Sequence, residues 1–138
     1  MAGLPIAKEA LVFLLVSLTE KWKVPVGYFL IDGLHGKERA NLLKLCIEKL
    51  FAVGVLVASV TFDGCSANFS MARELGASFD VNNIKPTFLH PVDPSKQVCL
   101  VLDACHMLKL MRNTLAEKKV LIDCDQGEIK WQYINAVV

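Results

Sequence analysis

The sequence predicts an α/β fold in which a mixed sheet is flanked by helices. Apolar runs of strand length alternate with segments whose apolar residues recur every three to four positions, the spacing of one helical face. The 138 residues are 54% hydrophobic, above the roughly 45–50% of an average soluble chain. Such a composition suits a sheet covered on both faces, or a domain that lacks a segment which should cover it. The length corresponds to one domain.

The N-terminal part predicts two strands and a helix. Strands are predicted over Ala10–Leu18 and Val24–Ile31, and the short polar connection favours an antiparallel pair. The first run is too short to span a bilayer, which needs about 20 residues. The helix is predicted over residues 37–54, with Gly54 as its left-handed C-terminal residue. Its apolar stripe is formed by Leu43, Cys46, Ile47, Leu50 and Phe51.

The remaining elements alternate between strand and helix. Residues 78–97 contain three prolines and are expected to be rich in loops. A parallel crossover is expected to link Val24–Ile31 to the next strand of the same sheet. The tail, residues 120–138, is ambiguous, and residues 129–138 are able to begin a further helix. The predicted elements are a strand over Val55–Phe62, a helix over Ser66–Leu75, a strand over Val98–Asp103 and a helix over Ala104–Lys119.

Charge and cysteine content exclude some functions. A formal net charge of +1 gives no global argument for nucleic-acid binding, although a local basic patch remains open. The five cysteines form no C-x-x-C pair, which argues against a disulfide framework and against a structural zinc site.

Asp63 and Asp103 are candidate metal ligands because each closes an apolar strand and opens a helix. In open α/β sheets, ligands bind at the carboxyl ends of the strands. If the two strands are neighbours, the two residues lie roughly 5 Å apart at the backbone, and carboxylates so placed suit Mg²⁺ or Mn²⁺. The alternative is that each aspartate caps its helix. Asp32, which closes another strand, is interpreted as a turn residue.

Basic residues recur after Asp103. Lys109 and Arg112 follow His106 at intervals of three, a stripe suited to phosphates or, alternatively, a solvated helix face. His106 itself is either a ligand or a capping or packed residue. No G-x-G-x-x-G, Walker A or G-x-S-x-G motif is present, so no nucleotide site or nucleophile elbow is predicted.

Three segments, in order, resemble blocks of P-element-type DNA transposases, a family that includes the vertebrate THAP-domain transposase relatives. They cover nearly the whole chain and read KEALVFLLVSLTEKWKVPVGYFLIDG, SVTFDGCSANFSMARELG and VLDACHMLKLMRNTL. The third is similar to the family's D-x-x-H-x-x-K-x-x-R-N signature, represented here by Asp103, His106, Lys109, Arg112 and Asn113.

The resemblance implies a ribonuclease-H-like mixed sheet with flanking helices and a parent enzyme that cuts and joins DNA. Asp63 then matches the second aspartate of a metal-binding acidic triad, and two Mg²⁺ or Mn²⁺ ions act in the intact parent. Asp103 is not one of the usual triad and becomes a supporting residue that either orients His106 or perturbs the site, and the rest of the signature becomes a set of DNA-contact candidates. The implied partner is DNA at transposon ends, with self-association, nuclear residence and no membrane.

The resemblance also implies that the domain in residues 1–138 is incomplete. The first strand with its catalytic aspartate, the C-terminal catalytic helix with its glutamate, and the THAP domain are expected outside this sequence. So is the GTP-binding insertion, with residues 120–138 beginning the connection to it. A slot is then expected between Ala10–Leu18 and Val55–Phe62, where each buried unpaired backbone group costs about 1–3 kcal/mol. A rearranged sheet, a strand supplied in trans, or aggregation would follow.

Three functions remain open at this point. The first is a fragment of a DNA transposase catalytic domain, inactive alone because one carboxylate cannot hold two ions. The second is a non-catalytic, domesticated module derived from such a transposase that binds DNA or another protein. The third is an unrelated α/β binding domain in which both aspartates only cap helices.

Overall fold

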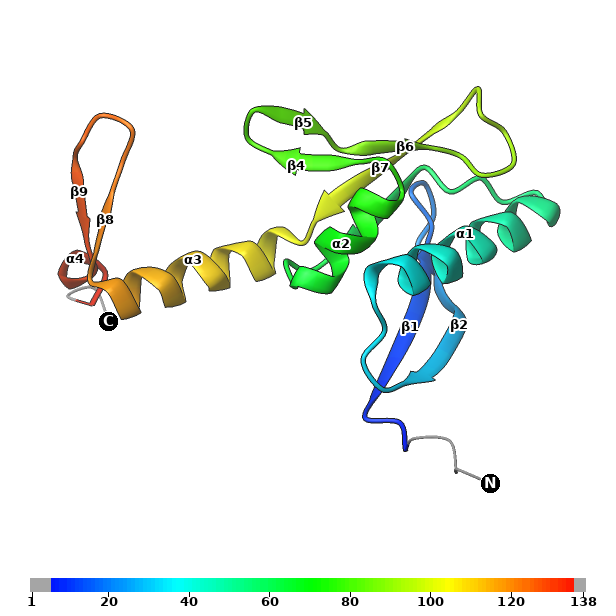
Figure 1. Ribbon diagram of the computed structural model, residues 1–138, viewed down its shortest axis with the longest axis horizontal. Helices are drawn as coiled ribbons and strands as arrows, with labels where there is room; N and C mark the ends of the chain where they lie inside the picture. Colours follow the sequence, from blue (N-terminus) through cyan, green and yellow to red (C-terminus); the bar gives the residue numbers. More distant parts are fainter. Residues whose placement is uncertain (1–5, 136–138) are drawn as a thin grey trace. The chain divides into compact units, whose positions relative to one another are not determined.

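The computed structural model describes residues 6–135 (Figure 1). These residues form two compact units. The first contains the described residues up to Val60 together with Cys65–Val101, and the second contains Thr61–Gly64 together with the described residues from Leu102 onward. The chain passes between the units within two strands, β3 (Ser59–Phe62) and β7 (Gln97–Leu102), which are hydrogen-bonded neighbours.

The first two strands form an antiparallel ribbon, as predicted. β1 (Glu9–Val16) pairs with β2 (Lys23–Ile31), and a register shift between Phe13 and Leu14 lets Pro25 face Leu14. Proline lacks an N–H, so such an irregularity accommodates it. β1 ends at Val16 rather than at the predicted Leu18, because the turn begins there: the hydroxyl of Ser17 accepts a hydrogen bond of 2.9 Å from the N–H of Glu20.

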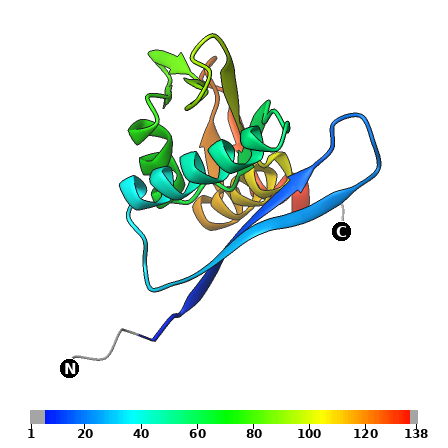
Figure 2. The same ribbon diagram turned by 90° about the vertical axis from the view of Figure 1, so that its right-hand side faces the viewer.

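The two strands of this ribbon run side by side along their length (Figure 2). Its two faces differ in exposure. On one face the side chains are half-buried, and the rings of Phe13 and Phe29 meet edge to face with centroids 5.9 Å apart. On the other, which we call the outer face, the apolar side chains are 53–75% exposed. The outer face is formed by Val12, Leu14, Val16, Tyr28 and Leu30.

The predicted long helix is α1 (Gly36–Ala52), which buries Ala40, Leu43 and Ile47. It ends as predicted, with Gly54 at a left-handed φ of 83°. The next strand was predicted from Val55, and that boundary is wrong. The N–H of Val55 donates to the carbonyl of Leu50, 3.0 Å away, so this residue closes the helix and β3 begins only at Ser59.

The main sheet has three strands in the order β3–β7–β6, with β6 (Thr87–Leu89) antiparallel to β7. The N–H groups of Cys99 and Asp103 donate to the carbonyls of Ala58 and Phe62, both at an offset of 41 residues along the chain. A constant offset means that β3 and β7 are parallel. The sheet is therefore mixed, as predicted.

The expected crossover from β2 into the same sheet is wrong. Among the described strands, β1 pairs only with β2, and β3 pairs only with β7, so the ribbon and the main sheet stay separate. The free edges of β1 and β3 are the two that the sequence analysis expected to border a slot.

Shorter elements complete the first unit. Helix α2 (Ser66–Glu74) matches its prediction closely, and its contacts are mainly with α1 and β4. The region expected to be loop also contains a hairpin of β4 (Ser78–Asp80) and β5 (Asn83–Lys85). The buried apolar residues of this unit are Ile31, Ala40, Leu43, Ile47, Met71, Ala72, Ala77, Phe88, Val98 and Leu100.

His90 organises the turn between β6 and β7. It is 1% exposed, and its Nδ1 accepts hydrogen bonds from the N–H groups of Val92 and Asp93 at 3.3 and 3.2 Å. Its ring lies against Phe51, with centroids 4.9 Å apart. The turn and the end of α1 are therefore tied together by one buried histidine, which the sequence analysis did not single out.

The second unit is built on α3 (Ala104–Lys118), which agrees with the predicted helix. A hairpin of β8 (Val120–Ile122) and β9 (Glu128–Lys130) follows, and then the short helix α4 (Trp131–Asn135). The hairpin was not predicted. The helix begins within the stretch where one was considered, whose last three residues lie outside the described range. No helix within residues 6–135 is long and apolar enough to cross a membrane.

Candidate active site

Asp63 lies directly after β3, at the edge where the parallel pair β3–β7 ends, and is half-buried. The N–H of Asp103 donates to the carbonyl of Phe62 at 2.9 Å, so the two strand ends are aligned. Asp63 and Asp103 thus follow the ends of two adjacent strands, which lie roughly 4.8 Å apart at the backbone. The N-cap of α2 is Cys65, so Asp63 does not occupy the capping position of that helix.

Asp103 occupies the N-cap position of α3. Its Oδ1 accepts hydrogen bonds from the N–H of Cys105 at 3.0 Å and from the N–H of His106 at 3.3 Å. This satisfies two of the N–H groups that a helix start leaves without partners. The capping interpretation therefore holds for Asp103, and its bond reaches the backbone of His106 rather than the imidazole.

We expect Asp103→Ala to destabilise the start of α3 by about 0.5–2 kcal/mol, the usual cost of removing an N-cap acceptor. Asp103→Asn keeps an oxygen at the same place and is expected to retain most of that stability. Amide hydrogen exchange in the first turn of α3, followed by NMR, measures the difference directly. Equal protection in the two variants would show that the cap contributes nothing.

The basic residues of α3 face solvent. Lys109 and Arg112, three positions apart, are exposed, whereas His106 is half-buried. The Nε and Nη2 of Arg112 donate to the Oδ1 of Asn113 at 3.2 and 2.7 Å. The signature residues therefore do not converge on one point: Asp103 caps the helix, and Lys109, Arg112 and Asn113 form an exposed polar face.

Gly64, next to Asp63, lies against α3. A Cβ added at this position would collide with the Cε of Met107 and lie 3.4 Å from the Cδ1 of Leu110. The φ angle of Gly64 is outside the left-handed region, so its backbone does not call for glycine, and an added Cβ would require the flexible end of the Met107 side chain to move. Sequence reasoning missed this contact, since the two partners lie more than 40 positions apart.

The donor set at the strand ends suits a divalent ion only in part. Mg²⁺ is commonly bound through one or two carboxylates while it keeps several waters, and Asp63 with Asp103 provides that number. Among residues 6–135, however, no three His, Cys, Asp or Glu side chains gather as an ion site. The described residues therefore fit one carboxylate arm of such a site, and they do not form a self-contained centre for two ions.

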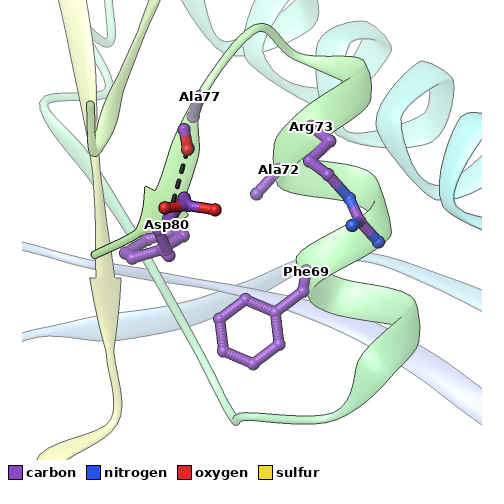
Figure 3. A pocket seen from close by; sticks show the side chains of 7 residues that line it. Phe69, Ala72, Arg73, Ala77 and Asp80 are labelled. Carbon is purple, nitrogen blue, oxygen red and sulfur yellow. Dashed lines mark hydrogen bonds between the residues drawn. The ribbon is translucent and has the colours of Figure 1, made fainter. Parts of the chain in front are cut away.

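A separate hollow of about 330 Å³ lies between α2 and β4 in the first unit (Figure 3). The ring of Phe69 on α2 meets Phe79 on β4 edge to face, with centroids 5.7 Å apart. The polar groups lining it come from Arg73, Ser78 and Asp80, and the hydroxyl of Ser78 accepts from the N–H of Asp80 at 3.1 Å. None of the sequence-predicted site residues lines it.

Comparison with known proteins connects this geometry to transposases. Residues 2–76 match the family model described as TNP-like, RNase H N-terminal domain, and residues 105–138 match TNP-like, GTP-binding insertion domain. The sequence analysis placed the insertion domain outside the chain. That expectation is corrected: the second match begins at residue 105, so part of the sequence similar to the insertion lies within it.

Two individual relatives are also transposases. The chain is 34% identical over 134 residues to human DNA transposase THAP9, covering 97% of this chain and 15% of that protein. It is 27% identical over 107 residues to the Transposable element P transposase of Drosophila melanogaster, covering 78% of this chain and 13% of that protein. The chain thus spans about one seventh of the length of these two relatives.

A solved structure has the same fold. The Drosophila P element transposase strand transfer complex superposes with a TM-score of 0.75 at 24% identity, over 91% of this chain and 26% of that one. This confirms the predicted ribonuclease-H-like α/β fold. The chain belongs to the TNP-like, RNase H N-terminal domain family and is a transposase-like sequence related to THAP9 and to the P-element transposase.

Proposed function

We propose that the chain acts as part of the catalytic domain of a DNA-cutting and DNA-joining transposase, in which Asp63 supplies one carboxylate to a divalent ion. The observation that carries this proposal is the position of Asp63. It is half-buried at the carboxyl end of β3, it neighbours Asp103 across the parallel β3–β7 pair, and it is not the N-cap residue of α2. Ligand chemistry collects at such strand ends in α/β sheets.

The residues around Asp63 have distinct roles in this proposal. Asp103 fixes the start of α3 through its cap bonds. Lys109 and Arg112 present positive charge to DNA phosphates, and Asn113 holds the Arg112 guanidinium in place. When bound, Mg²⁺ or Mn²⁺ supplies Lewis acidity for phosphoryl transfer. Because the described residues provide only one arm of the site, we expect the 138-residue chain alone to be inactive.

The proposal also assigns a cellular compartment and a nucleotide cofactor to the longer protein. A protein that acts on genomic DNA works in the nucleus, so we place the longer protein there. GTP is assigned only to a longer protein that contains the rest of the insertion, since the sequence present here has no phosphate-binding glycine motif. Self-association is proposed through the outer face of the β1–β2 ribbon, whose apolar side chains are unusually exposed.

The second candidate is a non-catalytic module derived from a transposase. The same outer face favours it, because contiguous exposed apolar surface often marks a protein interaction site. In this case Asp63 would have no ion to bind. The two candidates therefore make opposite statements about divalent-ion binding at residue 63.

Manganese binding tests the proposal. We expect Mn²⁺ to broaden the amide NMR signals of residues 63 and 64 in the 138-residue chain, and Asp63→Asn to weaken this binding about tenfold or more, which corresponds to about 1.4 kcal/mol. The matched control is Asp80→Asn, because Asp80 is an exposed carboxylate in the β4–β5 hairpin whose Oδ1 bond to the N–H of Asn82 an amide oxygen can replace.

The outcomes separate the candidates. Equal Mn²⁺ affinity of the wild-type chain and Asp63→Asn would reject the metal-ligand role and favour the non-catalytic module. Divalent-dependent nicking of DNA by the 138-residue chain would contradict the expected inactivity. Loss of binding in Asp63→Asn together with unchanged binding in Asp80→Asn is the result that the proposal requires.

A further inference from the structure

The loop that contains Asp63 lies in the region matched by one family model, but it packs against residues matched by the other. Residues 2–76, which include Asp63, match the RNase H N-terminal domain model. Residues 61–64, however, cluster with the described residues from Leu102 onward into one compact unit. In this unit Gly64 packs against α3, and most of α3 lies in the match to the GTP-binding insertion domain. The candidate ligand of the catalytic module is therefore supported by residues of the insertion module.

The contact itself is close and specific. The Cε of Met107, the end of a flexible side chain, occupies the space that a Cβ at Gly64 would take, and the Sδ would lie 3.5 Å from that Cβ, an ordinary contact distance. On the strand side, the Asp103 N–H fixes the carbonyl of Phe62 at 2.9 Å. The residues immediately before and after Asp63 are thus both held by residues at the end of β7 and the start of α3.

Contacts on both sides restrain the backbone at Asp63, from which the carboxylate projects. A metal ligand must be held in its productive position by packing of its neighbours, because small displacements weaken coordination. Met107 is half-buried, and its thioether is a soft ligand that Mg²⁺ and Mn²⁺ do not favour, so any effect it has on ion binding acts through its packing against Gly64. Methionine is unbranched and fills irregular gaps, which suits a contact against a bare backbone.

We propose that Met107 is a positioning residue for the Asp63 carboxylate, acting through its contact with Gly64, so that the insertion module sets the geometry of the metal-ligand turn. This inference rests on the proposed role of Asp63 as an ion ligand. It adds that the Met107 side chain transmits a displacement of α3 to the end of β3. The regions matched by the two family models are therefore coupled at this contact.

Three single variants of the 138-residue chain test the inference. We expect Met107→Ala to weaken Mn²⁺ binding at residues 63 and 64 about threefold or more, read from the same NMR broadening. Met107→Leu, which keeps the volume, is expected to retain the wild-type affinity. The matched control is Met111→Ala, which makes the same change one turn further along α3 at a side chain that is 64% exposed, and it should leave the affinity unchanged.

A double-variant cycle separates positioning from a general loss of stability. Gly64→Ala alone should weaken Mn²⁺ binding, because the new methyl group must displace Met107. In the Met107→Ala background that collision is gone, so the same substitution should cost little more. Such non-additivity identifies direct coupling between two residues. If Met107 served only the stability of the fold, the effects of Met107→Ala and Gly64→Ala on Mn²⁺ affinity would be additive. The affinity retained by Met107→Leu would then reflect stability alone.

The failures are distinguishable. If Asp63→Asn abolishes Mn²⁺ binding but Met107→Ala does not change it, the positioning inference is overturned and the proposed function stands. If Asp63→Asn leaves binding unchanged, both are overturned, since no ligand exists to be positioned. Equal weakening by Met107→Ala and Met111→Ala would also overturn the inference, because the effect would then belong to the helix as a whole.

Discussion

Ile47→Ala is expected to remove about 2–5 kcal/mol of folding stability. Ile47 is 1% exposed, in the middle of the buried stripe of α1. Truncation of a buried isoleucine removes its transfer free energy and leaves a cavity that neighbours fill only partly. Because a domain is typically stable by about 5–15 kcal/mol, this loss takes a large share of the total.

Leu45→Ala is the matched control on the same helix. Leu45 is 46% exposed, so its truncation removes less buried surface, while both variants place alanine, the best helix former, in the same helix. We expect it to cost less than about 1 kcal/mol. Urea unfolding followed by circular dichroism compares the two variants, with the transition midpoint reporting stability if the slope is unchanged. A cost for Leu45→Ala equal to that for Ile47→Ala would contradict the assignment of the core face.

Gly36→Ala is expected to cost about 1–3 kcal/mol or more, the range for overpacking a filled site. Gly36 is the buried first residue of α1, and its added Cβ would collide with the side chain of Ser70 on α2 and lie 2.6 Å from the backbone carbonyl carbon of that residue. The φ angle of Gly36 is not left-handed, so the collision alone produces the cost. Because a backbone atom is involved, the two helices must separate for the methyl group to fit.

Two comparisons make this prediction specific. Gly27→Ala adds the same methyl group in β2, where the nearest atoms are ring carbons of Phe13 and Phe29 at 3.6 Å, an ordinary contact distance, and we expect little loss. Ser70→Gly in the Gly36→Ala background should recover only part of the stability, since the backbone collision remains. Full recovery would mean that the side chain of Ser70 alone sets the packing distance of the helices. Thermal unfolding measures these three variants beside the wild-type chain.

Long periodic elements and the positions of two aspartates at strand ends were predictable from the sequence. The stripe that contains Leu43 and Ile47 places α1 correctly, and Gly54 marks its end with the expected left-handed backbone. The pattern placed Asp63 and Asp103 at the ends of two apolar strands but left open whether these strands are neighbours, and the structure shows that β3 and β7 are. Periodicity and composition are local signals, so they identify such elements well.

Other features depend on contacts that no local pattern encodes. Val55 continues an apolar run, but its N–H closes α1, and the strand therefore starts four residues later. The β8–β9 hairpin has strands of three residues, too short for a periodic signal, and its turn depends on Asp123, whose Oδ1 accepts from the N–H of Gly127 at 2.7 Å. The approach of Met107 to Gly64 links distant positions and is visible only in the folded chain.

The dual membership of residues 61–64 has a practical consequence for anyone who dissects these proteins. A cut anywhere between residues 76 and 105 looks natural from the boundaries of the two matched regions. Such a cut would nonetheless separate the loop after β3 from α3, the helix that this loop contacts. An N-terminal piece cut at residue 76 would also lose Phe88, Val98 and Leu100 from the buried set of the first unit, so loss of Mn²⁺ binding in such a piece would not by itself test the proposed role of Asp63.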